Sequence, residues 1–138
     1  PFGYNIPTGS TLFNNLARDL QTALDSGDPV NHVFDAQANV PLFLQRVNGD
    51  GVVPNSATNA LITAGKLKKV STLGPTAVGE GSGAYVVMTA GSHGSLLDPT
   101  ASPAATAEMR TQFIKFAVSA AQPGGPFLVI TNPSVIEK

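Results

Sequence analysis

The sequence predicts an α/β protein that has a mostly parallel sheet with helices packed on both of its faces. Two observations support this prediction. Segments rich in β-branched and aromatic residues alternate along the chain with segments of helical spacing. The two clearest strands, residues 40–47 and 84–89, are also apolar on both faces for most of their length, as in strands that helices cover on both sides. With 138 residues, the chain suits one domain or one contiguous segment of a larger one.

The first part of the chain, residues 1–39, is expected to be helical. Phe13, Leu16, Leu20 and Leu24 follow a three-and-four spacing, which predicts an amphipathic helix over residues 10–26. Gly27 and Pro29 come directly after this segment and are expected to end the helix. Its apolar stripe either packs against the sheet as core, which is the more common case, or forms part of a lid or connector over a hydrophobic cleft.

Residues 40–138 are expected to form the core. After strand 40–47, Pro54-Asn55-Ser56 offers a cap for a short helix that ends at Gly65. Residues 68–73 are predicted to form a strand or an extended connection.

The second half of the core begins with strand 84–89. Ser102-Pro103 is typical of a helix start, and Gly124-Gly125 closes that helix before a final strand at residues 127–130. The helical spacing predicts that its inner face consists of Met109, Phe113, Phe116, Ala117 and Ala120.

Composition excludes several classes of function. Eight basic and nine acidic residues give a net charge of −1, so nucleic acid is not expected as a partner. Lys66, Lys68 and Lys69 form the only basic cluster, which suits a solvated strand edge. The absence of cysteine excludes disulfides, zinc-thiolate sites and a cysteine nucleophile. The low charged fraction of 12% is typical of secreted or cell-envelope proteins of bacteria, and we expect that location.

Two loops follow the two clearest strands and carry the polar residues of greatest interest. Asp50 stands in a glycine-rich loop after strand 40–47, and His93 stands among small residues after strand 84–89. Loops at the carboxyl ends of parallel strands converge at one edge of the sheet, where ligands and catalytic groups gather. A carboxylate beside an imidazole can act there as the orienting acid and the proton carrier of a nucleophilic triad. Asp50 and His93 are therefore the candidate catalytic residues.

Both residues also have a simpler interpretation. Asn-Gly and Asp-Gly are strong hairpin signals, so Asp50 as a turn residue is an alternative. A hairpin needs a returning strand, however, and only Val52 and Val53 follow before Pro54. If Asp50 and His93 are only turn residues, the chain is a non-catalytic α/β interaction or structural domain.

The remaining titratable residues give weaker signals. His32 has no comparable setting and is expected to be structural or at the surface. Asp98 precedes a proline and is interpreted as a turn acid. Asp35 is interpreted as a helix-end or loop carboxylate, and it is the alternative to Asp50 as the acid of the triad.

No cofactor and no metal are expected. Neither glycine-rich stretch precedes Lys-Ser or Lys-Thr as in a P-loop, and residues 79–83 lack the third glycine of a dinucleotide motif. The loop around Asp50 lacks the later acidic positions of a calcium loop, and no two histidines share a helix face as zinc ligands would.

The spacing of these motifs resembles a known family. A strand ending in residues 49–54, Gly-Asp-Gly-Val-Val-Pro, is followed by a helix and by a second strand that ends in Gly91-Ser92-His93 before a long helix. This pattern, over residues 40–121, is similar to the C-terminal catalytic half of α/β-hydrolase-fold lipases and esterases, and most of all to the bacterial extracellular, virulence-factor type of lipase. The resemblance implies that Asp50 is the triad acid and His93 the base.

The nucleophile of that family is missing from this pattern. The G-x-S-x-G pentad does not occur, and residues 79–83 have glycine where it needs serine. The resemblance therefore implies that the serine lies upstream, outside this chain, and that the isolated chain is inactive. Expected partners are an ester or lipid substrate in the intact parent, the remainder of the parent chain, and a second copy through an exposed sheet edge. A stand-alone enzyme that uses Ser82 or Ser92 is a further alternative.

Overall fold

The computed structural model of the protein describes residues 6–138. Within this range the helices are α1 (Thr11–Leu24), α2 (Pro29–Asn39), α3 (Asn55–Ala64) and α4 (Pro103–Ser119), and short 3₁₀ turns occur at Asp25–Gly27 and Pro133–Val135. The strands are β1 (Phe43–Val47), β2 (Lys68–Lys69), β3 (Gly74–Ala77), β4 (Ala84–Met88) and β5 (Phe127–Ile130). The prediction of a mixed α/β protein is confirmed.

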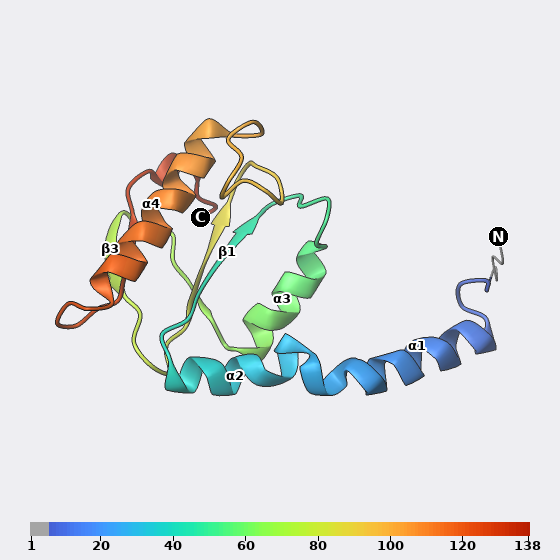
Figure 1. The fold of residues 1–138 in the computed structure, drawn as a ribbon. Helices are drawn as coiled ribbons and strands as arrows, with labels where there is room; N and C mark the ends of the chain where they lie inside the picture. Colours follow the sequence, from blue (N-terminus) through green and yellow to red (C-terminus); the bar gives the residue numbers. More distant parts are fainter. Residues whose placement is uncertain (1–5) are drawn as a thin grey trace.

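A small parallel sheet forms the centre of the molecule. Its strand order is β1-β4-β2, and Phe43 pairs with Ala84 at one end of the β1–β4 ladder while Val47 pairs with Met88 at the other. Figure 1 shows the two strands side by side and pointing the same way. Val86 and Val87, whose side chains point to opposite faces of β4, are 0% and 1% exposed, so both faces of this strand are covered, as its apolar sequence indicates.

The C-terminal segment completes one edge of this sheet. β2 pairs only with the beginning of β4. The end of β4 pairs instead with residues that follow β5. Ile136 forms an antiparallel bridge with Met88, and Glu137 donates its backbone N–H to the carbonyl of Val87 at 2.9 Å. The expected strand over residues 68–73 is therefore shorter, because the C-terminal segment takes its place.

A second, two-stranded ladder was not anticipated. β3 and β5 pair antiparallel, with Gly74 opposite Ile130 and Ala77 opposite Phe127. The strand expected at residues 127–130 exists, but it is not part of the parallel sheet. β3 begins with Gly74 at a φ of 103° and contains Pro75. Since glycine and proline are typical of turns, the sequence gives no signal for this edge strand.

α4 packs through a face different from the one predicted. Ser102 caps the helix as expected, because its Oγ accepts the N–H of Ala105 at 3.3 Å. The predicted contact of Phe113 is wrong, however, since its side chain is 56% exposed. The residues that the helix buries are Ala105, Thr106, Glu108, Met109, Gln112 and Ser119.

Polar side chains on α4 are buried because they find partners. Glu108 accepts a hydrogen bond from the Nε2 of Gln112 at 2.9 Å, and Gln45 of β1 donates to the Oε1 of Gln112 at 2.9 Å. Hydrophobic spacing takes no account of such bonds, so it placed Ala117 and Ala120 inward although both are exposed. Of the predicted inner face, Met109 is buried, and Phe116 packs on Phe43 with 5.4 Å between the ring centres.

α3 begins at Asn55, so the residue at its cap position is a proline and not a polar residue. Pro54 holds the cap position and no side chain caps the helix there, so the expected capping by Asn55 or Ser56 is wrong. With its amide oriented to satisfy both groups, Asn55 instead donates to the carbonyl of Val47 and accepts from the N–H of Gly49, each at 3.1 Å. The first residue of α3 therefore fixes the end of β1.

α1 extends away from the sheet (Figure 1) and buries none of its residues. The expectation that its apolar stripe is core is therefore wrong, because Leu16, Leu20 and Leu24 are exposed and Phe13 is only half-buried. Pro29 does not simply end this segment. It is the first residue of α2, where Asp28 caps the helix by accepting the N–H of Val30 at 2.9 Å. No helix in the described part of the chain has the length and apolar character needed to cross a membrane.

Candidate functional site

The carboxyl ends of β1 and β4 bring together the two loops that the sequence singled out. Because Val47 and Met88 are partners in the ladder, the following loops begin at the same edge of the sheet. The Nδ1 of His93 lies 3.0 Å from the Oδ2 of Asp50. Two residues that are 43 positions apart in the sequence thus form a direct hydrogen bond.

Asp50 is held in place by its own loop. Its Oδ1 accepts the backbone N–H of Val52 at 2.9 Å and that of Val53 at 3.1 Å, so the carboxylate also closes a turn. The hydrogen bond from His93 and then that from Val52 hold the pKa of the Asp50 carboxyl below its ordinary value. The turn interpretation and the triad interpretation are therefore compatible, because one oxygen shapes the loop while the other faces the imidazole.

His93 presents its second ring nitrogen to the surroundings. The side chain is 51% exposed, and no residue in 6–138 forms a hydrogen bond with its Nε2. An ionised carboxylate can only accept, so Asp50 places a proton on Nδ1. In the neutral imidazole Nε2 is then a free acceptor, which is the state that a general base requires.

The histidine loop is closed tightly by small residues. The Oγ of Ser95, which is completely buried, accepts the backbone N–H of Ser92 at 2.6 Å. Gly91 has a φ of 142°, and a Cβ at this position would lie 2.6 Å from that same Oγ. Only glycine fits here without displacing Ser95, so the chain can turn directly from β4 into the loop that carries His93.

Arg110 ties the far side of this loop to α4. Its Nε donates to the carbonyl of Leu96 at 2.9 Å and its Nη2 to that of Leu97 at 2.6 Å. Neither Arg110 nor Ser95 was predicted from the sequence to support this loop. Only Ser95 had a local signal, as a small polar residue among glycines, whereas the contact of Arg110 depends on how α4 packs.

Ser82 and Ser92, the two alternative nucleophiles, form no hydrogen bond with the imidazole of His93. The hydroxyl of Ser82 donates to the carbonyl of Gly79 at 2.9 Å, and the Oγ of Ser92 lies 3.5 Å from the Oγ of Ser95. Neither forms a hydrogen bond with His93, so the structure does not support a stand-alone serine enzyme built on them.

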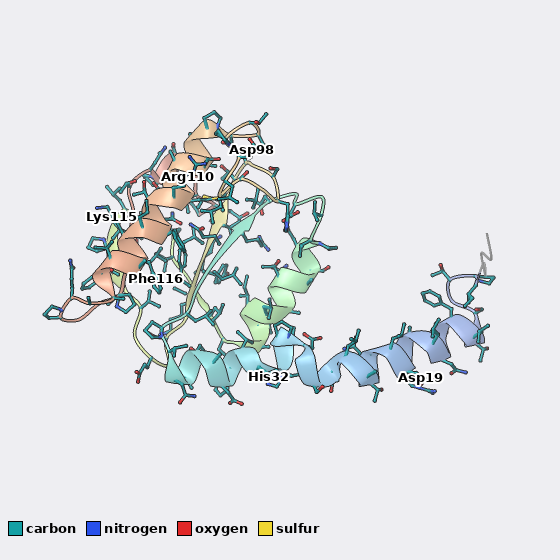
Figure 2. The ribbon with its side chains drawn as sticks, viewed as in Figure 1. Asp19, His32, Asp98, Arg110, Lys115 and Phe116 are labelled. Carbon is teal, nitrogen blue, oxygen red and sulfur yellow. The ribbon has the colours of Figure 1, made fainter. Side chains whose placement is uncertain are left out.

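The weaker candidates also lie apart from the pair. His32 is on α2, where its Nε2 bonds the carbonyl of Ser26 at 2.8 Å, and Figure 2 shows it far from the loop that ends at Asp98. Asp98 accepts hydrogen bonds from the hydroxyl of Thr100 and, at 2.9 Å, from its N–H, as expected of a turn acid. The hydroxyl contact and then the N–H contact lower the pKa of Asp98. Asp35 lies exposed on α2 and does not contact His93.

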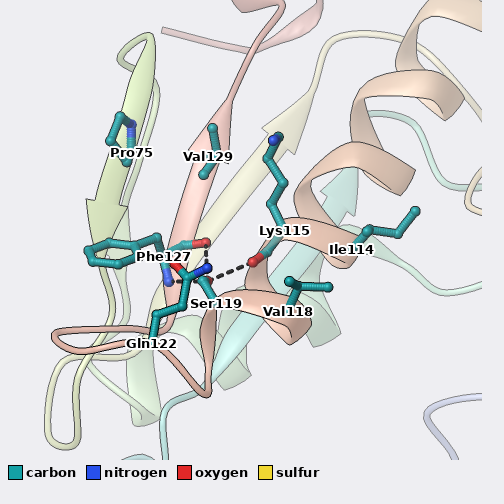
Figure 3. A pocket seen from close by; sticks show the side chains of 8 residues that line it. All are labelled: Pro75, Ile114, Lys115, Val118, Ser119, Gln122, Phe127 and Val129. Carbon is teal, nitrogen blue, oxygen red and sulfur yellow. Dashed lines mark hydrogen bonds between the residues drawn. The ribbon is translucent and has the colours of Figure 1, made fainter.

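A hollow with a volume of about 300 Å³ lies between α4 and the β3–β5 ladder, away from the Asp50–His93 pair. Figure 3 shows Ser119 at its base, where the hydroxyl donates to the carbonyl of Lys115 at 2.6 Å and accepts the N–H of Phe127 at 2.8 Å. Both hydrogen-bonding roles of this hydroxyl are used by the backbone. The Ser119 hydroxyl is therefore not free to act as a nucleophile, and the described residues contain no cluster of three or more metal-binding side chains.

Comparison with protein-family models, with curated proteins and with solved structures finds no match to this chain. The geometry of the Asp50–His93 pair is therefore the basis for assigning a function.

Proposed function

We propose that this chain supplies the acid and the histidine of a serine ester hydrolase that acts on lipid or short-acyl esters. The observation that carries the proposal is the 3.0 Å contact between the Asp50 carboxylate and the Nδ1 of His93, with Nε2 free. An ionised acid on one ring nitrogen and an open position at the other are what a nucleophilic triad needs. The resemblance of the two strand-end motifs to α/β-hydrolase lipases and esterases supports the same proposal.

His93 is the proton carrier in this proposal. Its Nε2 takes the proton of a serine hydroxyl as the oxygen attacks the ester carbonyl carbon, and the imidazole becomes an imidazolium. The same nitrogen then returns the proton to the departing alkoxide oxygen. Asp50 keeps its charge throughout, holds the ring through Nδ1 and stabilises the imidazolium. The lowered pKa of Asp50 favours the ionised form that this role requires.

The architecture proposed for the chain is a two-sided α/β layer of the hydrolase type. Gln45 of β1 donates to the carbonyl of Met109 on α4 at 2.9 Å. The next residue, Arg46, bonds the side chain of Asn59 on α3. Since successive side chains of a strand point to opposite faces, these contacts support helices on both sides of β1.

The test is ester hydrolysis by the complete gene product that contains this chain, with soluble p-nitrophenyl esters as substrates. His93→Ala and Asp50→Asn should each lower kcat by about 10³-fold or more, because triad members act as a unit. Asp19→Asn is the matched control for Asp50→Asn, since this exposed carboxylate lies on α1, away from the sheet, and it should leave kcat unchanged. A His93→Ala protein that keeps its turnover within severalfold of the wild type would refute the proposal. It would favour a non-catalytic α/β domain, in which Asp50 only shapes its turn.

A further inference from the structure

The C-terminal segment contacts the first residue of each loop that carries the site. The carbonyl of Val135 accepts the N–H of Thr89 at 2.9 Å and its hydroxyl at 3.2 Å. The carboxylate of Glu137 accepts the side-chain amide of Asn48 at 2.5 Å. Thr89 follows β4 directly, and Asn48 follows β1 directly. Two residues of one short segment are thus bonded to both strand ends from which the loops begin.

Four polar side chains share one face of the sheet: Arg46, Asn48, Lys69 and Glu137. Arg46 is the ladder partner of Val87, and on the other side of β4 the N–H of Glu137 bonds the carbonyl of Val87 at 2.9 Å. Since side chains two positions apart in a strand point to the same face, Asn48 points the same way as Arg46. Lys69 reaches this face from β2 and contacts Glu137. The four side chains therefore meet over β4.

These side chains form a continuous series of hydrogen bonds. The Nζ of Lys69 donates to the Oε1 of Glu137 at 2.8 Å, and the Nδ2 of Asn48 donates to the Oε2 of the same carboxylate. The Oδ1 of Asn48 accepts from the Nη2 of Arg46 at 3.1 Å. An ammonium and a guanidinium only donate, a carboxylate only accepts, and an amide does both. The amide at position 48 therefore satisfies both of its partners, whereas a carboxylate there would face Glu137 with a like charge.

The acid loop has little backbone rigidity of its own. Gly49 and Gly51 flank Asp50, and Gly49 has a φ of 71°, a conformation that glycine adopts freely. The turn that Asp50 closes through its Oδ1 fixes the shape of the loop. It does not fix the position of the loop relative to the loop of His93, so that position depends on contacts at the ends of the acid loop.

The contacts at these two ends differ in what they join. Asn55 bonds the end of β1 and the first glycine of the loop, which belong to the same stretch of chain. Asn48 joins the loop to its neighbours, because its backbone N–H bonds the carbonyl of Met88 at 3.0 Å and its side chain bonds Glu137. The side-chain contact is the one that reaches the C-terminal segment, which in turn bonds the start of the histidine loop.

We propose that Glu137 is a positioning residue of the site, which holds the acid loop and the histidine loop at the separation that their hydrogen bond needs. It acts on one loop through Asn48 and on the other through the bond of its own segment to Thr89. It forms no hydrogen bond with Asp50 or His93. The effect on catalysis rests on the proposed function, whereas the effect on the pair can be measured in this chain by itself.

Nitrogen-15 NMR of His93 tests the positioning. In Glu137→Ala the fraction of neutral imidazole that carries its proton on Nδ1 should fall, and the pKa of the Asp50 carboxyl should rise, because their contact is made less often. Ile136→Val is the matched control, since it shortens a buried side chain of the same segment and leaves the polar contacts in place. It should change neither value. A Glu137→Ala protein with the wild-type tautomer and the wild-type Asp50 pKa would overturn the proposal.

An exchange of the acid and the amide gives a second test. Asn48→Asp sets two carboxylates against each other and should lower the fraction of the Nδ1 tautomer as Glu137→Ala does. With Glu137→Gln added, the new amide can accept from Lys69 and donate to the new carboxylate, which also accepts from Arg46. Every hydrogen bond of the series is then restored, so the double variant should recover the tautomer. A double variant no better than Asn48→Asp alone would contradict the proposal.

Ester hydrolysis by the complete gene product separates this proposal from the proposed function. Glu137→Ala should lower kcat by about 10- to 100-fold and leave KM within about twofold, because misplacement of the pair slows the chemistry without changing how the substrate binds. A changed tautomer in a gene product that hydrolyses no ester would contradict the function and support the positioning. Hydrolysis with an unchanged tautomer in Glu137→Ala would contradict the positioning alone.

Discussion

Glu108 offers a quantitative test of how the loop after β5 is held. Its side chain is only 2% exposed and accepts four hydrogen bonds. Oε1 accepts from Gln112 at 2.9 Å and from the backbone N–H of Thr131 at 3.0 Å. Oε2 accepts from the hydroxyl of Thr131 at 2.6 Å and from the N–H of Asn132 at 2.9 Å. One carboxylate therefore satisfies two backbone amides just beyond β5.

The expected loss of stability follows from these bonds. Glu108→Ala leaves the N–H groups of Thr131 and Asn132 without a partner, at about 1–3 kcal/mol each. The side chains of Gln112 and Thr131 can turn to other partners, so we expect a total loss of about 4 kcal/mol. Glu108→Gln keeps the shape but directs an N–H₂ group at one of the two backbone amides, which should cost about 1–3 kcal/mol.

Urea unfolding followed by far-UV circular dichroism measures these losses. With a slope of about 2 kcal/mol/M, Glu108→Ala should lower the midpoint by about 2 M. Glu80→Ala is the matched control, because Glu80 is exposed in a turn and its removal should change the stability by no more than about 0.5 kcal/mol. If the two alanine variants unfold at the same urea concentration, the buried carboxylate does not hold the loop.

Three further results are expected. His93→Ala should raise the pKa of the Asp50 carboxyl towards its ordinary value, as read by carbon-13 NMR, while that of Asp98, which Thr100 lowers, should stay where it is; an unchanged Asp50 would disprove the contact. Because both carboxyls have lowered pKa values, their contribution to stability should be complete above about pH 4 and should disappear as the pH falls through the folded-state values. The urea midpoint should therefore decrease as the pH is lowered from about 5 to about 2, the range in which carboxyl groups ordinarily titrate. A midpoint that stays constant over this range would contradict the expectation. Gly91→Ala should destabilise the chain by about 1–3 kcal/mol and shift the ring resonances of His93, and a native-like spectrum would show that the loop tolerates a side chain.

The candidate site was predictable because it depends on short-range signals. Strands 43–47 and 84–88 are apolar enough to identify, and a polar residue follows each of them. Once two such strands are parallel neighbours, their loops must meet at one edge, so the sequence predicted the meeting of Asp50 and His93. Its catalytic use remains a proposal. The supporting contacts of Arg110 and Ser95 were not predictable, because they depend on how α4 lies against the loop.

The errors about the fold share one physical origin. Hydrophobic spacing identifies which segments are helices but not which partner each helix meets. α1 has a strong apolar stripe that remains exposed, whereas α4 buries Glu108 and Gln112 and exposes Phe113. Burial of a carboxylate depends on donors more than twenty positions away, which no local pattern contains.

The pairing of the C-terminal segment with β4 has a consequence for synthesis. Thr89, four residues before His93, donates its backbone N–H to the carbonyl of Val135 at 2.9 Å. The backbone that leads into the histidine loop is thus fastened by residues that the ribosome adds more than forty positions later. The sheet can begin to form as soon as β1 and β4 have emerged from the ribosome. The hydrogen bond between Thr89 and Val135 can form only later, because the chain between these two residues must be synthesised first. The backbone that leads to His93 can therefore be fastened only after the residues around Val135 have been synthesised.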